Sequence, residues 1–175
     1  GSGVANFLSH EDEEGVRRIL GETISHTGWI IIFFQVFVSR IAEKFRAIPT
    51  FLFGLFVAAL GFVVMGTAVP HAPALIFLGI FLFAVGEMVS SPRIQEYITW
   101  IAPKEKAGLY MGSNFLAVGI GGALSGVTYT WLYGHLRDLG HPERVWYILA
   151  VHLIVAIVVM LGFQRFAGEF TERQE

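Results

Sequence analysis

Residues 49–69 read PTFLFGLFVAALGFVVMGTAV, and no charged side chain interrupts these 21 residues. The hydrocarbon core of a bilayer is about 30 Å thick, and an α-helix needs roughly 20 residues to cross it. The run lacks the strict alternation of apolar and polar residues that marks a transmembrane strand. Because lipid offers no partners to the backbone, such a segment has to satisfy its own hydrogen bonds as a helix. The stretch therefore predicts a membrane-spanning helix.

The composition of the whole chain is also that of a membrane protein. Of the 175 residues, 54% are hydrophobic and 15% are charged, whereas soluble domains carry roughly 25% charged residues. The net charge of -2 and the lack of a basic stripe argue against a nucleic-acid partner. The chain has no cysteine, which excludes disulfides, thiolate catalysis and cysteine-bound zinc. We expect an all-α polytopic membrane protein embedded in the lipid bilayer, with no cofactor and no metal site.

Five apolar segments organise the chain into a transmembrane bundle over residues 27–168. Before it, residues 1–26 are predicted to be a polar extramembrane segment, in which residues 1–3 have the composition of an expression scar. After it, residues 169–175 are predicted to form a cytoplasmic tail. The third span is long enough only if its helix continues past Pro92, and the first span is the shortest. The predicted spans are 27–45, 48–69, 74–102, 107–133 and 144–164.

The loop charges predict the orientation of the bundle. With five spans, the loops on one side hold eight Lys and Arg residues and those on the other side hold four. Cytoplasmic loops carry the excess of basic residues, so we expect a cytoplasmic C-terminus in a bacterial inner membrane. The eight residues are Arg40, Lys44, Arg46, Arg93, Lys104, Lys106, Arg165 and Arg173.

The loop between the first two spans carries a recognisable charge pattern. Residues 39–46 read SRIAEKFR, which resembles the cytoplasmic loop signature Gly-x-x-x-Asp-Arg-x-Gly-Arg-Arg of the major facilitator superfamily. Glu43 and Lys44 stand where that signature has Asp and Arg. The resemblance implies that Arg40, Glu43 and Lys44 belong to a cytoplasmic loop that holds the two halves of a transporter in one conformation, through charge pairing.

The third and fourth spans carry a second resemblance. Residues 86–92 read GEMVSSP, residues 101–106 read IAPKEK, and residues 109–112 read LYMG. This order resembles the tenth and eleventh helices of the proton-dependent oligopeptide transporter family. The resemblance implies that the five spans are helices eight to twelve of a twelve-helix transporter whose N-terminal half is missing here. It also implies a small-molecule substrate, with peptides and protons as the transported species.

Glu87 is the residue that most directly suggests chemistry. In a helix from Ala74 to Ala102 it lies near the middle, where an ionisable group costs at least about 2.5–3.5 kcal/mol without a partner or a watery cavity. Desolvation disfavours its charged form, so it can take up a proton near neutral pH. The family resemblance implies substrate binding or proton coupling, and the structural alternative is a hydrogen bond to a neighbouring helix. Ser90 and Ser91 follow at i+3 and i+4 and either extend a polar stripe or satisfy the backbone near Pro92.

Other polar residues in the spans have more than one interpretation. Arg93 and Glu96 lie further towards the cytoplasm and are expected to form surface or gating salt bridges. Gln35 and Asn114 either join helices or line a cavity. His152 lies within the fifth span, and we favour a structural role for it although an intramembrane histidine is commonly functional.

The leading hypothesis is a fragment of a secondary transporter that works by alternating access. The alternative is a membrane scaffold or half-size protein that dimerises through its glycine-rich fourth span, where Gly122-x-x-x-Gly126 permits close helix approach. That span is nonetheless more simply explained by packing within the chain. We do not expect an enzyme, because no His-Glu-x-x-His, no Gly-x-Ser-x-Gly and no paired catalytic acids occur in the spans.

Overall fold

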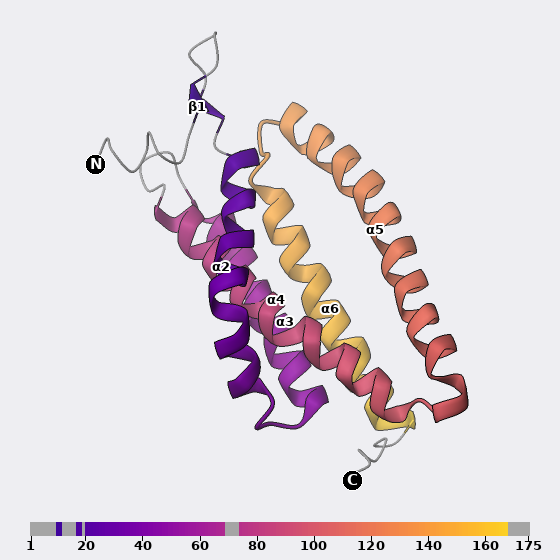
Figure 1. Ribbon diagram of the computed structural model, residues 1–175. Coiled ribbons are helices and arrows are strands. Elements are labelled where there is room, and N and C mark those ends of the chain that lie inside the picture. Colours follow the sequence, from indigo (N-terminus) through magenta and orange to yellow (C-terminus); the bar gives the residue numbers. More distant parts are fainter. Residues whose placement is uncertain (1–9, 12–16, 19, 69–73, 168–175) are drawn as a thin grey trace.

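The computed structural model of the chain describes residues 10–11, 17–18, 20–68 and 74–167. A bundle of long helices makes up the chain from Leu20 onwards, so the expected all-α membrane fold is confirmed. A short two-stranded antiparallel ribbon precedes the bundle (Figure 1). The predicted scar, most of the polar segment before Leu20 and the predicted tail at 169–175 lie outside the described residues. The elements are β1 (His10–Glu11), β2 (Arg17–Arg18), α2 (Leu20–Ala42), α3 (Ala47–Gly66), α4 (Ala74–Ile101), η1 (Lys104–Lys106), α5 (Ala107–Asp138) and α6 (Arg144–Ala167).

Four of these helices, α3 to α6, are long and apolar enough to cross a membrane. In α2 the apolar part is shorter and runs over Ile31–Ala42. The helix itself begins at Leu20, so the last residues of the segment predicted to be a polar extension are helical. A helix can continue beyond the apolar zone into water, because its backbone hydrogen bonds are internal. The α4 helix runs without a break through Pro92 to Ile101.

The closest helix contact joins α3 and α4 through four glycines. Gly54 and Gly61 are seven residues apart on α3, and Gly79 and Gly86 are seven apart on α4. A Cβ atom on Gly54 would lie 2.7 Å from the Gly86 carbonyl oxygen, and one on Gly61 would lie 2.7 Å from that of Gly79. Because two antiparallel helices meet at both pairs, even one extra methyl group would push them apart. Small residues serve the same purpose in other membrane helix pairs.

The α6 helix packs against the other side of α3 and completes the core. Its Tyr147 ring covers Gly66, where an added Cβ would lie 2.8 Å from the ring. Trp146 stacks on Phe62 with ring centroids 6.1 Å apart. At the opposite end of α3, a buried cluster is formed by Ala47, Ile48 and Tyr97.

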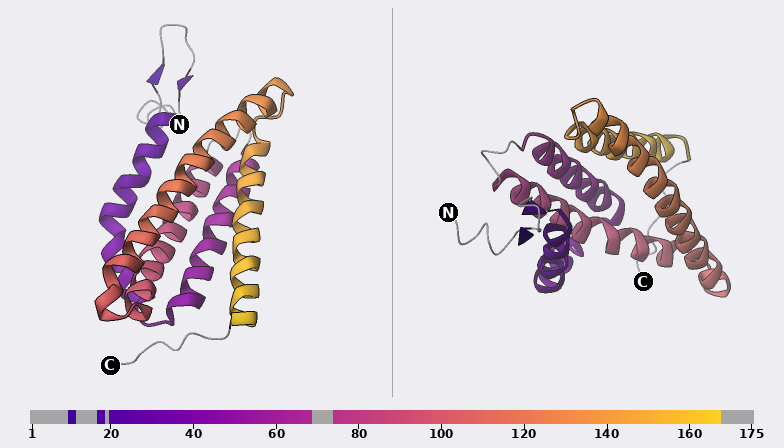
Figure 2. Two further views of the ribbon diagram at one scale, coloured as in Figure 1. Left: turned by 90° about the vertical axis from the view of Figure 1, so that its right-hand side faces the viewer. Right: turned by 90° about the horizontal axis from the view of Figure 1, so that it is seen from above.

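The α5 helix lies along the outside of the other helices (Figures 1 and 2). Leu136 is the one buried residue among its described side chains. A Cβ atom added at any of its glycines, from Gly108 to Gly134, would meet nothing within 4 Å. The expectation that these glycines pack within the chain is therefore wrong, because no described helix lies against that face. The close approach occurs instead between α3 and α4.

Candidate functional site: a polar pocket between α2 and α4

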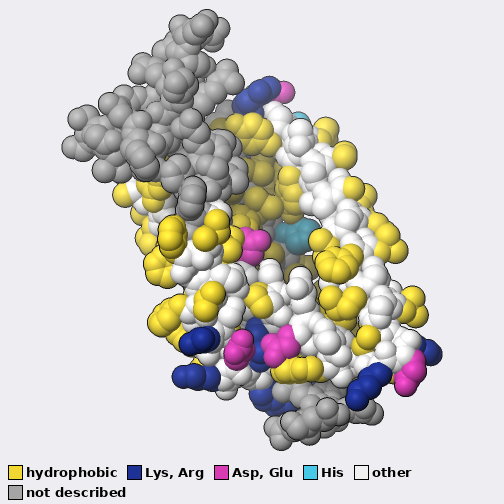
Figure 3. Space-filling model, in the orientation of Figure 1, with side chains coloured by type: hydrophobic (Ala, Val, Ile, Leu, Met, Phe, Trp, Pro, Cys, Tyr) yellow, Lys and Arg dark blue, Asp and Glu magenta, His cyan; other side chains and the backbone are white. Residues whose placement is uncertain are grey.

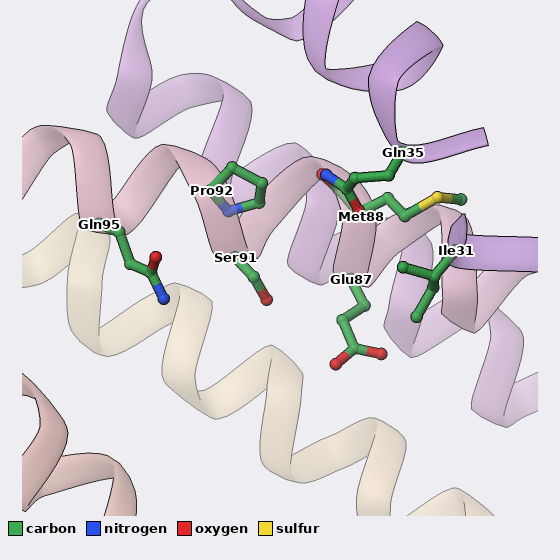
Figure 4. A pocket seen from close by; sticks show the side chains of 7 residues that line it. All are labelled: Ile31, Gln35, Glu87, Met88, Ser91, Pro92 and Gln95. Atoms are coloured by element: carbon green, nitrogen blue, oxygen red, sulfur yellow. The ribbon is translucent and has the colours of Figure 1, made fainter. Parts of the chain in front are cut away.

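A pocket of about 250 Å³ lies between α2 and α4. Figure 4 shows that Glu87, Ser91 and Gln95 project from one side of α4, one helical turn apart, and that Ile31 and Gln35 come from α2. Met88 and Pro92 complete the lining. The pocket thus combines one carboxylate, two amides and one hydroxyl with apolar walls.

Glu87 is the acidic group of this pocket. It lies 13 residues after Ala74 and 14 before Ile101, which is about 20 Å of helix in each direction. The side chain is exposed, and its carboxylate has no hydrogen bond or ion pair with any described residue. The structural alternative of a hydrogen bond to a neighbouring helix is therefore not realised in the described part of the chain. A carboxylate at this depth requires a cation, a proton or water.

Ser90 and Ser91 have different environments although both are within one turn of Glu87. Ser91 is exposed and lines the pocket with Glu87. Ser90 is buried against α3. A Cβ atom added to Gly54 of α3 would lie only 2.9 Å from the Cβ atom of Ser90. The Ser90 hydroxyl lies 3.5 Å from the Glu87 carbonyl oxygen. Of the two serines, Ser91 is thus the one that extends the polar stripe.

Gln35 joins α2 to α4 and lines the pocket at the same time. Its Nε2 donates to the Met88 carbonyl at 3.3 Å and to the Ser39 hydroxyl at 2.9 Å. In an uninterrupted helix the Met88 carbonyl would accept the N–H of residue 92. Residue 92 is proline, which has no N–H, so Gln35 replaces the missing donor. The Gln35 amide therefore both joins two helices and lines the pocket.

The candidate gate residues lie around the α2–α3 turn, next to the end of the pocket that Pro92 and Gln95 line. Arg40, Glu43 and Lys44 are exposed where α2 ends, and their side chains form no ion pair with the described residues. Arg93 is only 3% exposed. It donates to the Glu96 carboxylate and to the Phe45 carbonyl in the α2–α3 turn, and its guanidinium lies 5.8 Å from the centre of the Trp100 ring.

One residue predicted for the site lies away from the pocket, and one pocket residue was not predicted. Asn114 lies on α5 and does not line the pocket. Gln95, which does line it, was missed by the sequence reasoning. The signal was present, because Gln95 continues the i, i+4, i+8 series of Glu87 and Ser91, which places all three on one helical face.

The surface separates into zones along the helix direction. In Figure 3 the charged side chains gather towards the ends of the molecule, and hydrophobic side chains cover the middle. Within that middle zone an acidic side chain and a histidine side chain are visible in a hollow. A hydrophobic belt with charges at both ends is the arrangement expected for a bundle in a bilayer.

Long apolar helices around a polar pocket define an integral membrane protein of the polytopic helical class. Residues 19–172 match the family model of the Major Facilitator Superfamily, and the chain belongs to this superfamily. Multidrug resistance protein MdtH of Yersinia enterocolitica is 30% identical over 122 residues, which are 69% of this chain and 30% of that protein. The protein of the same name from Salmonella arizonae is 28% identical over 138 residues, or 78% of this chain and 33% of that protein.

The chain thus spans about 30% of the length of the relatives it matches. These relatives are named for multidrug resistance, so they support the superfamily and not the narrower resemblance to oligopeptide transporters. No solved structure matches the chain.

Proposed function

We propose that the chain is part of a secondary transporter that moves small amphipathic organic solutes across the bacterial inner membrane by alternating access. The observation that carries this proposal is the Glu87 carboxylate, which has no partner among the described residues and lies in a pocket halfway along α4. Secondary transporters bind substrate and coupling ions near the bilayer midplane, between two halves that rock around the site. In this proposal the other half belongs to the longer parent protein, as it does in full-length superfamily members.

Glu87 is proposed as the site of proton coupling. A proton gradient can drive a conformational change only if the two states bind protons differently. A carboxylate in a pocket that opens to opposite sides of the membrane in the two states would meet this condition. Glu87 would therefore load a proton on one side of the membrane and release it on the other.

The pocket favours drug-like solutes as the substrate class. Its apolar side chains, Ile31, Met88 and Pro92, offer contact to a hydrophobic body. The amides and the carboxylate fix orientation, as in ligand sites generally. The relatives' name points to the same class. Peptide transport with protons, which the resemblance of residues 86–112 implies, is the competing substrate class, and one assay decides between the two.

Arg93 is proposed to hold the cytoplasmic end of the site closed. It ties α4 to the α2–α3 turn through the Phe45 carbonyl. Arg40, Glu43 and Lys44 are exposed at that turn and have no ion pair with the described residues, so we propose that they pair with the other half of the transporter. Opening towards the cytoplasm would then require this attachment to rearrange.

The test uses the full-length parent protein in liposomes with an imposed pH gradient. Movement of ethidium is measured by fluorescence, and uptake of labelled di- and tripeptides is measured in parallel. We expect Glu87→Gln to abolish gradient-driven ethidium movement and Glu105→Gln, in the exposed η1 turn, to leave it unchanged. Gradient-driven movement that survives Glu87→Gln would refute the coupling role, and uptake of peptides without ethidium would replace the proposed substrate class.

A non-transporting dimer remains the second candidate, because the glycine face of α5 is open in the described chain. On that hypothesis Gly122→Leu converts a crosslinkable dimer to monomer, and no form of the protein transports. Transport by a monomeric parent protein would remove this candidate.

A further inference from the structure

Four polar residues of α4 lie on one ridge that begins at Glu87. Glu87, Ser91, Gln95 and Thr99 follow one another at intervals of four residues, and all four are exposed in the described chain. Figure 4 shows the first three projecting from the same side of the helix. Twelve residues of helix are about 18 Å long, so the ridge extends from the middle of α4 almost to its end at Ile101. We call these four residues the polar ridge.

The polar ridge extends from Glu87 in one direction only. The residues at the same spacing before it are all apolar, namely Leu75, Gly79 and Phe83. Residues 74–86 contain no polar side chain at all. Helix α3 also packs against this half of α4, where the ring centroids of Phe83 and Phe62 lie 5.0 Å apart. Along α4, the polar approach to Glu87 is therefore from the η1 end.

Contacts within the described chain leave most of the polar ridge without partners. The Ser91 hydroxyl and the Gln95 amide form no hydrogen bond with any described residue. The Thr99 hydroxyl donates to the Gln95 carbonyl of its own helix at 3.0 Å and lies 3.9 Å from the Met111 sulfur on α5. Its oxygen is still able to accept a hydrogen bond. Polar groups in a membrane-spanning helix need another helix or water to satisfy them.

Two explanations account for such a ridge. The first is that its side chains join α4 to the other half of the transporter through hydrogen bonds between helices. Such contacts can occur anywhere along a helix, so they do not explain why the ridge begins at the carboxylate and continues without a gap to one end. The second explanation is a chain of water molecules that connects the carboxylate with the aqueous phase. This explanation accounts for both features.

We propose that the polar ridge is the path by which Glu87 exchanges its proton with the η1 side of the membrane. In the state that is open towards η1, the protonated carboxyl gives its proton to a water held by the Ser91 hydroxyl. The proton then moves along further waters to the bulk and leaves a carboxylate. The Gln95 amide orients these waters but does not itself take the proton. This inference rests on the proposed transport function and assigns one of its proton-transfer steps to named side chains.

The Arg93 attachment and the polar ridge lie on different sides of α4. Arg93 follows Ser91 by two residues, which is about 200° around the helix, and its guanidinium binds the Phe45 carbonyl and the Glu96 carboxylate. Among the described residues that line the pocket, Glu87 is the only titratable one. The proposed path therefore does not pass through Arg93, and this arginine can hold α4 in place without occupying the ridge.

The first test asks where water reaches α4. Single cysteines in the full-length parent protein, with any other cysteines replaced, are treated in membranes with an impermeant methanethiosulfonate. This reagent reacts irreversibly, so it accumulates on every state that the protein visits. We expect Ser91→Cys and Gln95→Cys to react from the same side as Glu105→Cys in η1. Two controls should react from neither side: Ile94→Cys, which is nearer the helix end than Ser91 but packs on a buried cluster, and Phe81→Cys, which is exposed in the apolar half of α4.

The second test asks whether the ridge carries protons. Threonine and valine have nearly the same shape, so Ser91→Thr keeps a hydroxyl that Ser91→Val removes. In liposomes with an imposed pH gradient, we expect Ser91→Val to move ethidium about fivefold more slowly than Ser91→Thr, which corresponds to one hydrogen bond lost from the water chain. The valine variant should also slow further in D₂O, because proton transfer has become the slow step. A purely structural role of Ser91 would produce no such isotope effect.

The outcomes distinguish this inference from the proposed function. The inference is overturned if Ser91→Cys in monodisperse protein does not react from the Glu105 side, if Ile94→Cys reacts as readily, or if Ser91→Thr and Ser91→Val move ethidium equally fast. Ethidium movement that is lost in Glu87→Gln would in that case still support transport, with a proton path along another helix. Conversely, the expected cysteine pattern in a protein without gradient-driven movement would keep the aqueous path and reject the transport proposal.

Discussion

At the scale of single residues, Pro92 and Gln35 compensate each other across two helices. Proline removes the backbone donor that the Met88 carbonyl would otherwise accept, and the Gln35 amide supplies a replacement at 3.3 Å. A buried acceptor without a donor costs about 1–3 kcal/mol. The pairing therefore explains how a proline is accommodated in an unbroken helix beside the pocket.

This compensation predicts a coupled pair of substitutions. Gln35→Leu alone should lower the melting temperature in detergent, because the Met88 carbonyl loses its donor. Pro92→Ala restores the helical N–H, so Gln35→Leu should cost less in the Pro92→Ala background. The interaction energy of the double-mutant cycle should be about 1 kcal/mol. Additive effects would show that the Gln35 amide does not serve this carbonyl.

Arg93 leads to a second residue-scale prediction. Its buried guanidinium binds the Phe45 carbonyl and the Glu96 carboxylate, whereas Arg40 is exposed. Arg93→Ala leaves both partners without a donor and should lower the melting temperature by several degrees. Arg40→Ala is the matched control and should change it little. Equal effects of the two substitutions would mean that burial of Arg93 has no consequence for stability.

At the scale of helices, the α3–α4 contact depends on the four glycines. Gly86→Ala would place a methyl group 2.5 Å from the Ala58 nitrogen and the Gly54 oxygen, and these backbone atoms cannot move separately from their helix. We expect a large loss of folded, monodisperse protein in size-exclusion chromatography. Gly119→Ala on α5, where the space is open, should be harmless and can even favour the helix. Loss of folded protein with the α5 variant alone would contradict this packing.

The sequence predicts where the helices lie but not which residues of different helices contact each other. Length and hydropathy predict the helices, and the i+4 spacing predicts that Ser91 shares a face with Glu87. At about 100° per residue, Ser90 (i+3) and Ser91 (i+4) lie on opposite flanks of Glu87 around the helix. The flank with Ser90 is buried because α3 packs against it, and the spacing within α4 does not predict where α3 lies. The partners Gln35–Met88 and Tyr129–His152 are 53 and 23 residues apart. Periodicity within one helix contains no information about such pairs.

The glycines were misjudged for a related reason. A glycine-rich helix is consistent with close packing, but the sequence does not say which helix is the partner or whether it belongs to the described chain. The glycines of α5 are numerous and open, whereas Gly54, Gly61, Gly79 and Gly86 are fewer and tightly packed. Their spacing of seven on both helices is the signal that could have identified the contact.

At the scale of the whole molecule, the remaining question is how the bundle is oriented in the membrane. Successive spanning helices alternate in direction, so the η1 turn lies on one side and the α5–α6 loop on the other. The excess of Lys and Arg predicts that η1 lies in the cytoplasm. The cysteine-free chain allows a direct measurement, because a single introduced thiol reports its own side of the membrane.

We expect His141→Cys, in the α5–α6 loop, to react with a membrane-impermeant maleimide in intact cells. Glu105→Cys, in η1, should react only after the cells are opened. Both measurements use the full-length parent protein with any other cysteines replaced, and both positions are exposed, so access depends on the side alone. The reverse labelling pattern would place the C-terminus outside. Glu87 would then take up its proton from the opposite compartment, and the direction of the proposed transport cycle would have to be reversed.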